Sequence, residues 1–322
     1  MNILVTGGAG YIGSHVVLEL CEKGYKVIVL DDLSLGNESS VDKRAEFILG
    51  STHDKKLLST IMNDIEAVIH LAAFKAAGES MKNPTKYSFN NIAGSISLID
   101  SMLKYNTKKM IFSSTAAVYG EPLSLPIDEN HPTSPINYYG FTKLKVEEIL
   151  QWYSKINDLK SVSLRYFNAA GYDKKQRASA LENNPQNLIP IVMECAAGIR
   201  SNMEVFGDDY NTHDGTCLRD YIHVSDLAKA HVSALEYLED NSHLTTNLGT
   251  GDTHSVYDVI NMTKAITGKN INYKTVKRRS GDPSELYARS ILAKDVLNWS
   301  ATHSSLKNII ETTWSMYQNL NI

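Results

Sequence analysis

The sequence predicts an α/β protein built on a doubly wound parallel sheet. Strand-like and helix-like stretches alternate along the first half of the chain, which is the pattern of βαβ units. A glycine-rich turn follows the first apolar run, and an acidic pair follows the second. The chain has 322 residues, which suggests about two domains of typical size, and its second half is less regular.

The first strand, turn and helix are the most specific part of this pattern. Residues 2–6 form a short, mostly apolar run that suits a buried parallel strand. Gly7–Gly13 (Gly-Gly-Ala-Gly-Tyr-Ile-Gly) follows directly and leads into apolar residues at helical spacing. Residues 26–30 read as a second strand that ends at Asp31. Strand, glycine turn, helix, strand and acid is the order of a Rossmann-type dinucleotide-binding unit.

This order predicts which cofactor the chain binds. The glycines let the backbone approach a pyrophosphate, and the helix amino terminus directs its N–H groups at the phosphates. Asp31 is expected to accept hydrogen bonds from the adenosine ribose. No Arg or Lys lies between Asp31 and Ser40, and Asp32 adds a second carboxylate that would repel a 2′-phosphate. We therefore predict NAD rather than NADP; a glycine turn in an unrelated α/β protein is the alternative.

The remaining elements of the first half are expected to place their ends together. Strands are predicted at 67–71, 109–113 and 161–166, and helices at 87–105 and 138–154. Ligands of doubly wound sheets bind outside the carboxyl ends of the strands. The residues at these ends are Thr6, Asp31, Leu71, Ser113 and Phe167.

The chain changes character after Asn168. Polar, irregular stretches are predicted at 173–186 and 208–216, and residues 169–322 are interpreted mainly as a smaller α/β substrate domain. Residues 1–168 are interpreted as the cofactor domain. The stretch 220–224, the helix 225–239 and a strand near Asn247 are expected to return to the first sheet. A cleft between the two domains would suit a small molecule.

Tyr139 and Lys143 are the candidate catalytic pair. Residues four apart on a helix share one face. A phenol ionises at about pH 10, and a neighbouring ammonium favours the phenolate by about 1.4 kcal/mol for each unit of pKa. Thr115 could hydrogen-bond the same substrate oxygen, so the three groups form a proton-transfer device for an alcohol that becomes a ketone. The alternative is a solvated pair on a helix surface.

Composition excludes several classes of function. The chain is 43% hydrophobic and 21% charged, and its net charge of −4 gives no electrostatic reason to bind nucleic acid or an anionic membrane. It has no apolar run of about 18 residues and no recognisable leader. Cys21, Cys195 and Cys217 are odd in number and lack Cys-x-x-Cys spacing, which favours the reducing cytoplasm and argues against a zinc site or other metal.

The whole chain resembles the UDP-glucose and UDP-N-acetylglucosamine 4-epimerases of the extended short-chain dehydrogenase/reductase superfamily. The resemblance to the superfamily rests on the glycine-rich turn and on Tyr139-x-x-x-Lys143. The resemblance to the epimerases rests on six further stretches: Leu71–Ser80, Phe112–Gly120, Leu164–Asn168, Phe206–Tyr210, Asp214–Val224 and Arg278–Asp282.

The resemblance implies a mechanism. Tyr139 as phenolate would take the proton from the sugar O4–H while the C4 hydride passes to tightly bound NAD. The 4-keto intermediate would rotate and receive the hydride on its other face, which interconverts UDP-glucose and UDP-galactose. Lys143 would hold the nicotinamide ribose and lower the pKa of Tyr139. Thr115 would hydrogen-bond O4.

The resemblance also implies two sets of binding residues. The cofactor would be bound by Gly7, Gly10, Tyr11, Ile12, Gly13, Asp31, Asp32, Ser51, Thr52, Leu71, Ala72, Ala73, Lys75, Asn90, Tyr139, Lys143, Tyr166 and Phe167. The substrate would be bound by Thr115, Asn168, Asn187, Leu188, Val205, Phe206, Arg219, Arg279, Asp282 and Leu286. Within the second set, two arginines would clamp the diphosphate, for which a guanidinium is well suited.

Two positions depart from the family pattern. Ser51 stands where an Asp commonly accepts from the adenine amino group, and a neutral acceptor is weaker, so we expect weaker retention of NAD. Leu286 stands four residues past Asp282, where members restricted to galactose tend to have Tyr. A smaller side chain there predicts a roomier pocket that admits N-acetylated UDP-hexoses.

Related functions stay open to different degrees. A 4,6-dehydratase needs an acid and a base just after Thr115, and Ala116 and Ala117 can transfer no proton. Reduction of a ketosugar by NADPH is disfavoured by Asp31. Another UDP-sugar epimerase or a decarboxylase of the same superfamily remains an alternative, and a non-catalytic NAD-binding relative is less favoured because Tyr139 is retained with its partners. The resemblance further implies a homodimer through helices 87–105 and 138–154, and leaves open whether the product serves galactose metabolism or polysaccharide synthesis.

Overall fold

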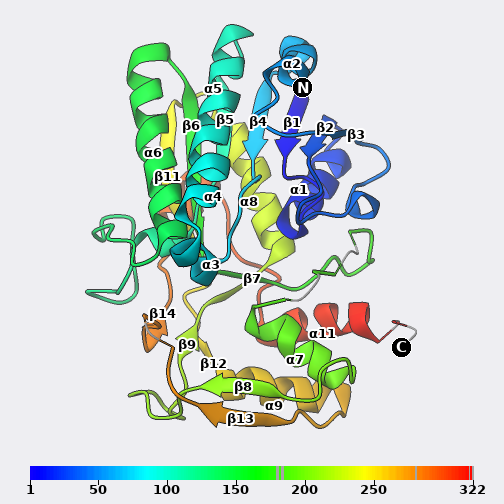
Figure 1. Ribbon diagram of the computed structural model, residues 1–322, viewed down its shortest axis with the longest axis vertical. Coiled ribbons are helices and arrows are strands. Elements are labelled where there is room, and N and C mark those ends of the chain that lie inside the picture. The colour runs from blue at the N-terminus through cyan, green and yellow to red at the C-terminus, as the bar shows by residue number, and fades with distance from the viewer. Residues whose placement is uncertain (179–180, 183–184, 280, 319, 321–322) are drawn as a thin grey trace.

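A seven-stranded, wholly parallel sheet forms the centre of the computed structural model, which describes residues 1–178, 181–182, 185–279, 281–318 and 320 (Figure 1). Its strand order is β3-β2-β1-β4-β5-β6-β11. The strands are β1 (Asn2–Thr6), β2 (Lys26–Asp31), β3 (Glu46–Leu49), β4 (Ala67–His70), β5 (Lys109–Ser113), β6 (Lys160–Tyr166) and β11 (His243–Leu248). The doubly wound parallel sheet predicted from the sequence is therefore present.

Helices cover both faces of this sheet. One face packs against α1 (Tyr11–Glu22) and α8 (Val224–Tyr237), through a core that includes Val16, Leu20 and Leu227. The other face packs against α2 (Lys55–Ile61), α5 (Gly94–Lys104) and α6 (Tyr138–Asn157), through Leu58, Leu98 and Val146. Strands buried on both faces need continuous apolar runs, which is the pattern seen in residues 2–6 and 109–113.

One long helical run contains a change of helix type. The predicted helix 87–105 is α4 (Pro84–Tyr87), a π-helical segment (Ser88–Ala93) and α5 without interruption. A further short helix, α3 (Ala77–Lys82), precedes it, and 3₁₀ turns lie at Glu38–Ser40, Met62–Asp64 and Ala116–Val118.

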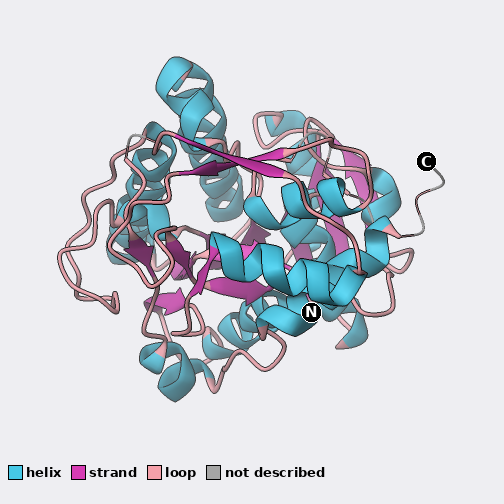
Figure 2. Ribbon diagram, turned by 90° about the horizontal axis from the view of Figure 1, so that it is seen from below, coloured by secondary structure: helices cyan, strands magenta, loops and turns pink. Residues whose placement is uncertain are grey.

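The rest of the chain forms a second region built from short sheets (Figures 1 and 2). Its strands are β7 (Asn168–Ala170), β8 (Met203–Phe206), β9 (Leu218–Arg219), β10 (Tyr221–His223), β12 (His254–Ser255), β13 (Tyr273–Val276) and β14 (Glu285–Leu286). Its helices are α7 (Leu188–Ala196), α9 (Val256–Thr267) and α11 (Leu306–Tyr317). Helix α10 (Ile291–Leu297) instead packs with α8 and β11 in the core of the main sheet. A separate apolar core joins α7, α9 and α11 through residues such as Val192, Val259 and Ile310.

One sequence-based expectation about the return of the chain was wrong. The stretch 220–224 does not join the main sheet: β10 pairs with β7 in a two-stranded sheet of its own. The reason is local, because Asn168 donates from its backbone to Asp220 O at 3.1 Å and aligns the two strands just beyond the end of β6. The strand near Asn247 does join the main sheet, where β11 pairs with β6.

Some sequence features fall outside the described residues. These are Ser280, within the Arg278–Asp282 motif, and residues 179–180 and 183–184, within the predicted irregular stretch 173–186. Among the residues that the structure describes, no helix is long and apolar enough to cross a membrane.

Candidate active site

A cavity of about 370 Å³ lies where β1, β2, β4, β5 and β6 end. Every residue predicted to bind the cofactor lines it, from the glycine-rich turn to Tyr166 and Phe167. Thr115, predicted to contact the substrate, lines the same cavity. The carboxyl edge of a parallel sheet thus brings together residues that are spread over 160 positions of the chain, from Gly7 to Phe167.

The glycine-rich turn has a shape that larger residues could not adopt. Gly7 has φ of +74°, and a Cβ there would lie 2.5 Å from the Ala72 backbone nitrogen. A Cβ on Gly13 would lie 2.1 Å from Gly7 O. Helix α1 begins at Tyr11 after Gly10, which provides no side-chain cap. Its first N–H groups are therefore free of a side-chain acceptor at the cavity, as a site for phosphate requires.

Asp31 is held in one orientation at the end of β2. It is buried, Ala9 N donates to its Oδ2 at 3.0 Å, and Leu33 N donates to its Oδ1 at 2.9 Å. Burial raises the pKa of Asp31, and the two backbone donors oppose that shift. Asp32 also lines the cavity. Two neighbouring carboxylates at this edge fit ribose hydroxyls and disfavour an additional phosphate.

Tyr139, Thr115 and Lys143 meet at the opposite end of the cavity. Tyr139 and Lys143 lie on α6, and the Tyr139 phenol is hydrogen-bonded to the Thr115 side chain. Lys143 is 4% exposed, and its Nζ donates to Ser113 O at 2.7 Å. The three predicted catalytic residues are therefore in one place, with the lysine directed at the backbone of the strand end.

The electrostatics of this group differ from the sequence-based expectation. Burial raises the pKa of Tyr139 to about 12, and the hydrogen bond with Thr115 opposes that shift. Burial also lowers the pKa of Lys143 to about 7, and the Glu147 carboxylate opposes that shift. The expected lowering of the Tyr139 pKa by Lys143 is thus not produced by the protein groups alone, because desolvation penalises both charged forms.

The π-helical segment separates two neighbouring asparagines. Asn90 lines the cavity, whereas Asn91 is buried and bonds in three directions. Phe74 N donates to Asn91 Oδ1 at 2.9 Å, and Asn91 Nδ2 donates to Phe74 O and to Thr142 Oγ1, each at 3.0 Å. Asn91 therefore fastens the loop after β4 to α6. The sequence does not indicate which asparagine faces the cavity, because a π-helical segment interrupts the 3.6-residue period of an α-helix.

His70 continues this polar network into the sheet. Ser95 Oγ donates its one proton to Asn91 O, so His70 Nε2, at 2.8 Å, donates to Ser95 Oγ. His70 Nδ1 then accepts from Thr6 Oγ1 at 2.7 Å. Burial and the nearby Lys143 ammonium lower the pKa of His70 to about 3, so the ring is neutral and holds one tautomer.

Glu182 lines the cofactor cavity and was not identified from the sequence. It forms an ion pair with Lys75, which lies in the loop that follows β4. Other lining residues that were not predicted to bind the cofactor are Leu30, Ser34, Leu35, Gly36, Gly50, Phe74 and Ala169; Ser113, expected at the ligand-binding edge of the sheet, also lines the cavity. Most of these flank predicted residues; Glu182 lies in an irregular stretch where no periodicity or motif could have singled it out.

A second cavity of about 520 Å³ adjoins the first, and Asn168, Ala169 and Asn187 line both. Arg219 Nη2 lies 3.4 Å from Asp282 Oδ1, and the Arg279 guanidinium lies 3.8 Å from the centre of the Phe206 ring. The predicted substrate residues that line this cavity are Asn168, Asn187, Leu188, Phe206, Arg219, Arg279 and Asp282.

Two predicted substrate residues do not line either cavity. Val205 is 1% exposed because its side chain packs into the core of the second region, so its backbone alone is available to a ligand. Leu286 pairs with Arg219 in the register of β9 and β14. Its side chain packs against the cluster of Val118, Tyr119 and Ile127.

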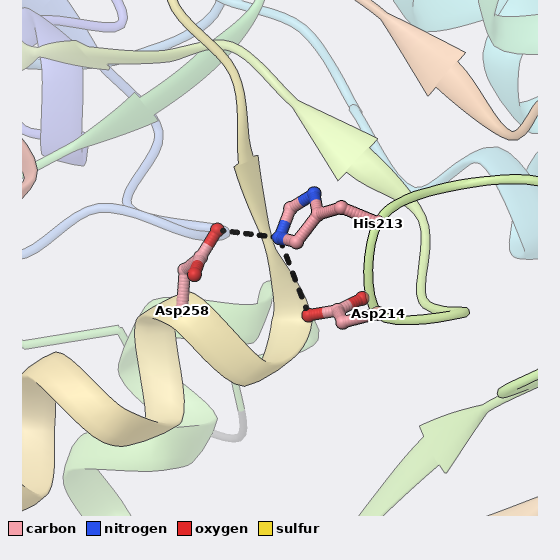
Figure 3. Close-up of side chains that lie close together, drawn as sticks. All are labelled: His213, Asp214 and Asp258. Carbon is pink, nitrogen blue, oxygen red and sulfur yellow. Dashed lines mark ion pairs between the residues drawn. The ribbon is translucent and has the colours of Figure 1, made fainter.

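A cluster of His213, Asp214 and Asp258 lies at the start of α9 (Figure 3). His213 Nε2 is 3.7 Å from Asp214 Oδ2 and 3.5 Å from Asp258 Oδ2. Both of these oxygens already accept a hydrogen bond from Ser255, one from its hydroxyl and one from its backbone N–H. The cluster therefore fastens the loop before β9 to the capping box of α9.

Comparisons with known proteins agree with this geometry. Residues 3–249 match the model of the NAD dependent epimerase/dehydratase family. The UDP-glucose 4-epimerase of Halalkalibacterium halodurans is 46% identical over 321 residues, which covers 99% of this chain and 96% of that protein.

Solved structures show the same likeness. UDP-glucose 4-epimerase from Brucella ovis in complex with NAD is 43% identical with a TM-score of 0.96, and 98% of each chain is covered. The Bifidobacterium longum UDP-glucose 4-epimerase in complex with NAD⁺ and UDP is 37% identical with a TM-score of 0.94, covering 100% of this chain and 99% of that one. This chain belongs to the NAD dependent epimerase/dehydratase family.

Proposed function

We propose that this chain catalyses the NAD-dependent 4-epimerisation of UDP-hexoses, with UDP-glucose and UDP-galactose as the principal pair. One observation carries the proposal: the cavity that holds Tyr139 and Thr115 adjoins the cavity that holds Arg219 and Arg279. In this proposal Tyr139 and Thr115 act as the proton-transfer pair and Arg219 and Arg279 as the diphosphate clamp, in two cavities that adjoin each other. The relatives named above have this activity, and the present residues repeat its chemical requirements.

The first cavity fits NAD. The glycine-rich turn and the start of α1 would hold the pyrophosphate, and Asp31 would hold the adenosine ribose. Lys143, Tyr166 and Phe167 would line the nicotinamide end. When bound, NAD supplies the group that accepts a hydride from the sugar C4 and returns it.

Tyr139 is the residue that would move the proton. Its phenol is hydrogen-bonded to Thr115, so a sugar O4–H beside both hydroxyls can pass its proton to Tyr139 along a prepared direction. A positive charge beside the phenol favours its ionised form. Lys143 can supply that charge once its ammonium is protonated, which couples its own ionisation to the acidity of Tyr139.

The second cavity would hold the UDP part of the substrate. Arg219 and Arg279 present two guanidinium groups suited to a diphosphate, and Asp282 presents a carboxylate suited to ribose hydroxyls. The backbone at Val205, in β8, is an edge that could hydrogen-bond uracil. In this proposal residues 1–168 bind mainly the cofactor, and residues 169–322 bind mainly the UDP-sugar.

Leu286 bears on which sugar enters. Its side chain packs beside the Val118–Tyr119–Ile127 cluster, and a leucine lacks the ring and hydroxyl that a tyrosine would add at this position. N-acetylated UDP-hexoses are therefore included among the proposed substrates. Leu286 would act by its size, since a leucine offers no hydrogen bond to the sugar.

A cytoplasmic homodimer completes the proposal. Phe89 and Ile96 on the long helical run are exposed, and so are Trp152 and Ile156 on α6, which share one helix face. Apolar residues exposed on two neighbouring helices suit an isologous contact with a second copy. Sedimentation of the wild type and a Trp152→Glu/Ile156→Lys variant would test this, and equal masses would contradict it.

The deciding experiment compares 4-epimerisation of UDP-galactose, UDP-GlcNAc and UDP-glucuronate without added cofactor. We expect turnover of UDP-galactose with the NAD that co-purifies, and slower turnover of UDP-GlcNAc. Release of CO₂ from UDP-glucuronate would favour the decarboxylase alternative. Binding of NAD without any turnover would favour a non-catalytic relative.

A further inference from the structure

A buried ion pair lies directly behind the catalytic group. Glu147 is on α6, one turn after Lys143 and two turns after Tyr139, and it is 1% exposed. Arg165, near the end of β6, donates from Nε to Glu147 Oε1 at 3.0 Å and from Nη2 to Oε2 at 2.5 Å. Residues four apart on a helix share a face, so this carboxylate lies on the side of α6 that carries the proton-transfer residues.

Stability alone is a weak reason for such a pair. The cost of removing both charges from water often exceeds their attraction, and apolar replacements are frequently no less stable. Arg165 has a further partner, because its Nη1 donates to Tyr119 OH at 3.0 Å, and Tyr119 OH in turn donates to Asn247 Oδ1 at 2.7 Å. The structure thus fixes the position of the Glu147 carboxylate from several sides.

Glu147 also contacts the turn that carries Thr115. Ser114 Oγ donates to Glu147 Oε1, while Lys143 Nζ donates to Ser113 O at 2.7 Å. The Tyr166 phenol is hydrogen-bonded to Ser113 Oγ. The two residues before Thr115 are therefore held from α6 and from β6, which leaves Thr115 little freedom to move away from Tyr139.

We infer that Glu147 is a positioning residue for the proposed reaction: held by Arg165, it fixes the Ser113–Thr115 turn and supplies a negative charge that favours the protonated form of Lys143. This inference rests on the proposed function for its kinetic consequence. Its electrostatic consequence does not depend on which substrate the chain uses.

The surroundings of Lys143 explain why this charge matters. Glu147 on α6 and His70 on β4 interact electrostatically with Lys143, and Tyr139 on α6 and Tyr166 on β6 line the same cavity. His70 is neutral, and burial raises the pKa of Tyr139 and of Tyr166, so none of these three groups offers a negative charge at neutral pH. Since the pKa of Lys143 is about 7, a change in the charge on Glu147 alters the protonated fraction directly.

The test uses the two halves of the ion pair. Glu147→Gln removes the attraction, so the pKa of Lys143 should fall by about one unit. Arg165→Gln removes the neutralising partner, so the pKa of Lys143 should rise. Both values are measured on the holoenzyme by NMR of ¹³C-labelled lysine, with Lys143→Arg to identify the resonance. A purely structural role would not move the pKa in opposite directions.

Kinetics give the second readout. At pH 7 Glu147→Gln should lower kcat for UDP-galactose about fivefold, and KM should change by less than about twofold, because a one-unit fall in the pKa of Lys143 reduces its protonated fraction by that factor. A single variant that leaves one buried charge unpaired can fail to fold. The double variant Glu147→Gln/Arg165→Met removes both charges together, so it is used in that case. Its Lys143 pKa should still lie below that of the wild type, since Glu147 is the nearer charge.

The matched control is Asp226→Asn, which alters another fully buried carboxylate, bonded to Ser304 and His303, outside the site. It should lower the unfolding midpoint and leave the pKa of Lys143 unchanged. Equal Lys143 pKa values in the wild type and in the double variant would overturn the inference. If the Lys143 pKa shifts as expected in the Glu147→Gln and Arg165→Gln variants but the wild type shows no turnover, the result would instead count against the proposed function.

Discussion

The two cavities are built in different ways. The cofactor cavity lies on the carboxyl edge of one continuous sheet, and much of its wall is backbone, with Gly7 and Gly13 in positions that exclude a Cβ. The second cavity is lined by residues of the two- and three-stranded sheets, of loops and of the first turn of α7. Its arginines, Arg219 and Arg279, are sixty positions apart and meet through tertiary contacts. A backbone site tolerates few substitutions, whereas a side-chain site can change its ligand one residue at a time.

The largest expected effect lies in the first cavity. Tyr139→Phe removes the hydroxyl that would move the proton and leaves the ring, so kcat should fall about 10²- to 10⁴-fold while KM changes little. The measurement is turnover of UDP-galactose by the purified holoenzyme. Tyr138→Phe, on the same helix but bonded to Ser88, is the matched control. Undiminished turnover by Tyr139→Phe would break the assignment of chemistry to this cavity.

Removal of a guanidinium should show the different character of the second cavity. Arg279→Met keeps the length of the side chain and its contact with Phe206, and loses the charged donors. A hydrogen bond to a charged group is worth about 1.5–3 kcal/mol, so KM for UDP-galactose should rise about tenfold to a hundredfold. NAD content should stay at the wild-type level. Loss of NAD in this variant would mean that the two cavities are not separable.

Acid should affect both regions alike. Burial lowers the pKa of His70 in the first region to about 3 and that of His223 in the second to about 4, from an ordinary value of 6.5. The unfolded chain therefore binds these protons first, and stability present above pH 6.5 is lost as the pH falls. Each histidine should remove about 2 kcal/mol at pH 5. Urea midpoints at pH 7 and pH 5 test this; a midpoint that does not fall would contradict it.

A change of size should alter substrate choice in the second region without touching the first. Leu286→Tyr adds a ring and a hydroxyl beside the Val118 cluster, so the ratio of kcat/KM for UDP-GlcNAc to that for UDP-galactose should fall about tenfold. Leu286→Met, of similar volume, is the control. Equal rejection of UDP-GlcNAc by the wild type and by Leu286→Tyr would remove this role from the position.

The smallest expected effect is at the adenine end of the first cavity. Ser51→Asp replaces a neutral acceptor with a charged one, which is worth about 1 kcal/mol, so NAD should dissociate about fivefold more slowly. Ser51→Ala is the control and should dissociate faster than the wild type. Full occupancy of wild-type protein by NAD that dialysis does not remove would contradict weak retention by Ser51.

The residues of the cofactor cavity could be predicted from local sequence patterns more fully than those of the second cavity. The turn at Gly7–Gly13 and the Tyr139–Lys143 spacing are local, so sequence order alone indicates their neighbours and the sheet that carries them. Arg219 and Arg279 could be named through resemblance, because no local pattern joins them. Glu182 gave no sequence signal at all, since its partner Lys75 is more than a hundred positions away.

Two further results needed coordinates for physical reasons. The pKa of a buried group depends on desolvation, which sequence spacing does not report, and this reversed the expected direction for Tyr139. The strand at 221–223 carries an apolar pattern that suits either sheet, and its pairing with β7 is decided by the backbone bond between Asn168 and Asp220.

Asn168 and Asn187 line both cavities, and this shared border affects how substrate and product are exchanged. NAD and a UDP-hexose that fill these two spaces would meet at that border. The glycine-rich turn and the two arginines, which would hold the two diphosphates, line different cavities, so the sugar nucleotide could leave while NAD stays bound. Many successive sugars can thus be served by a single resident nucleotide.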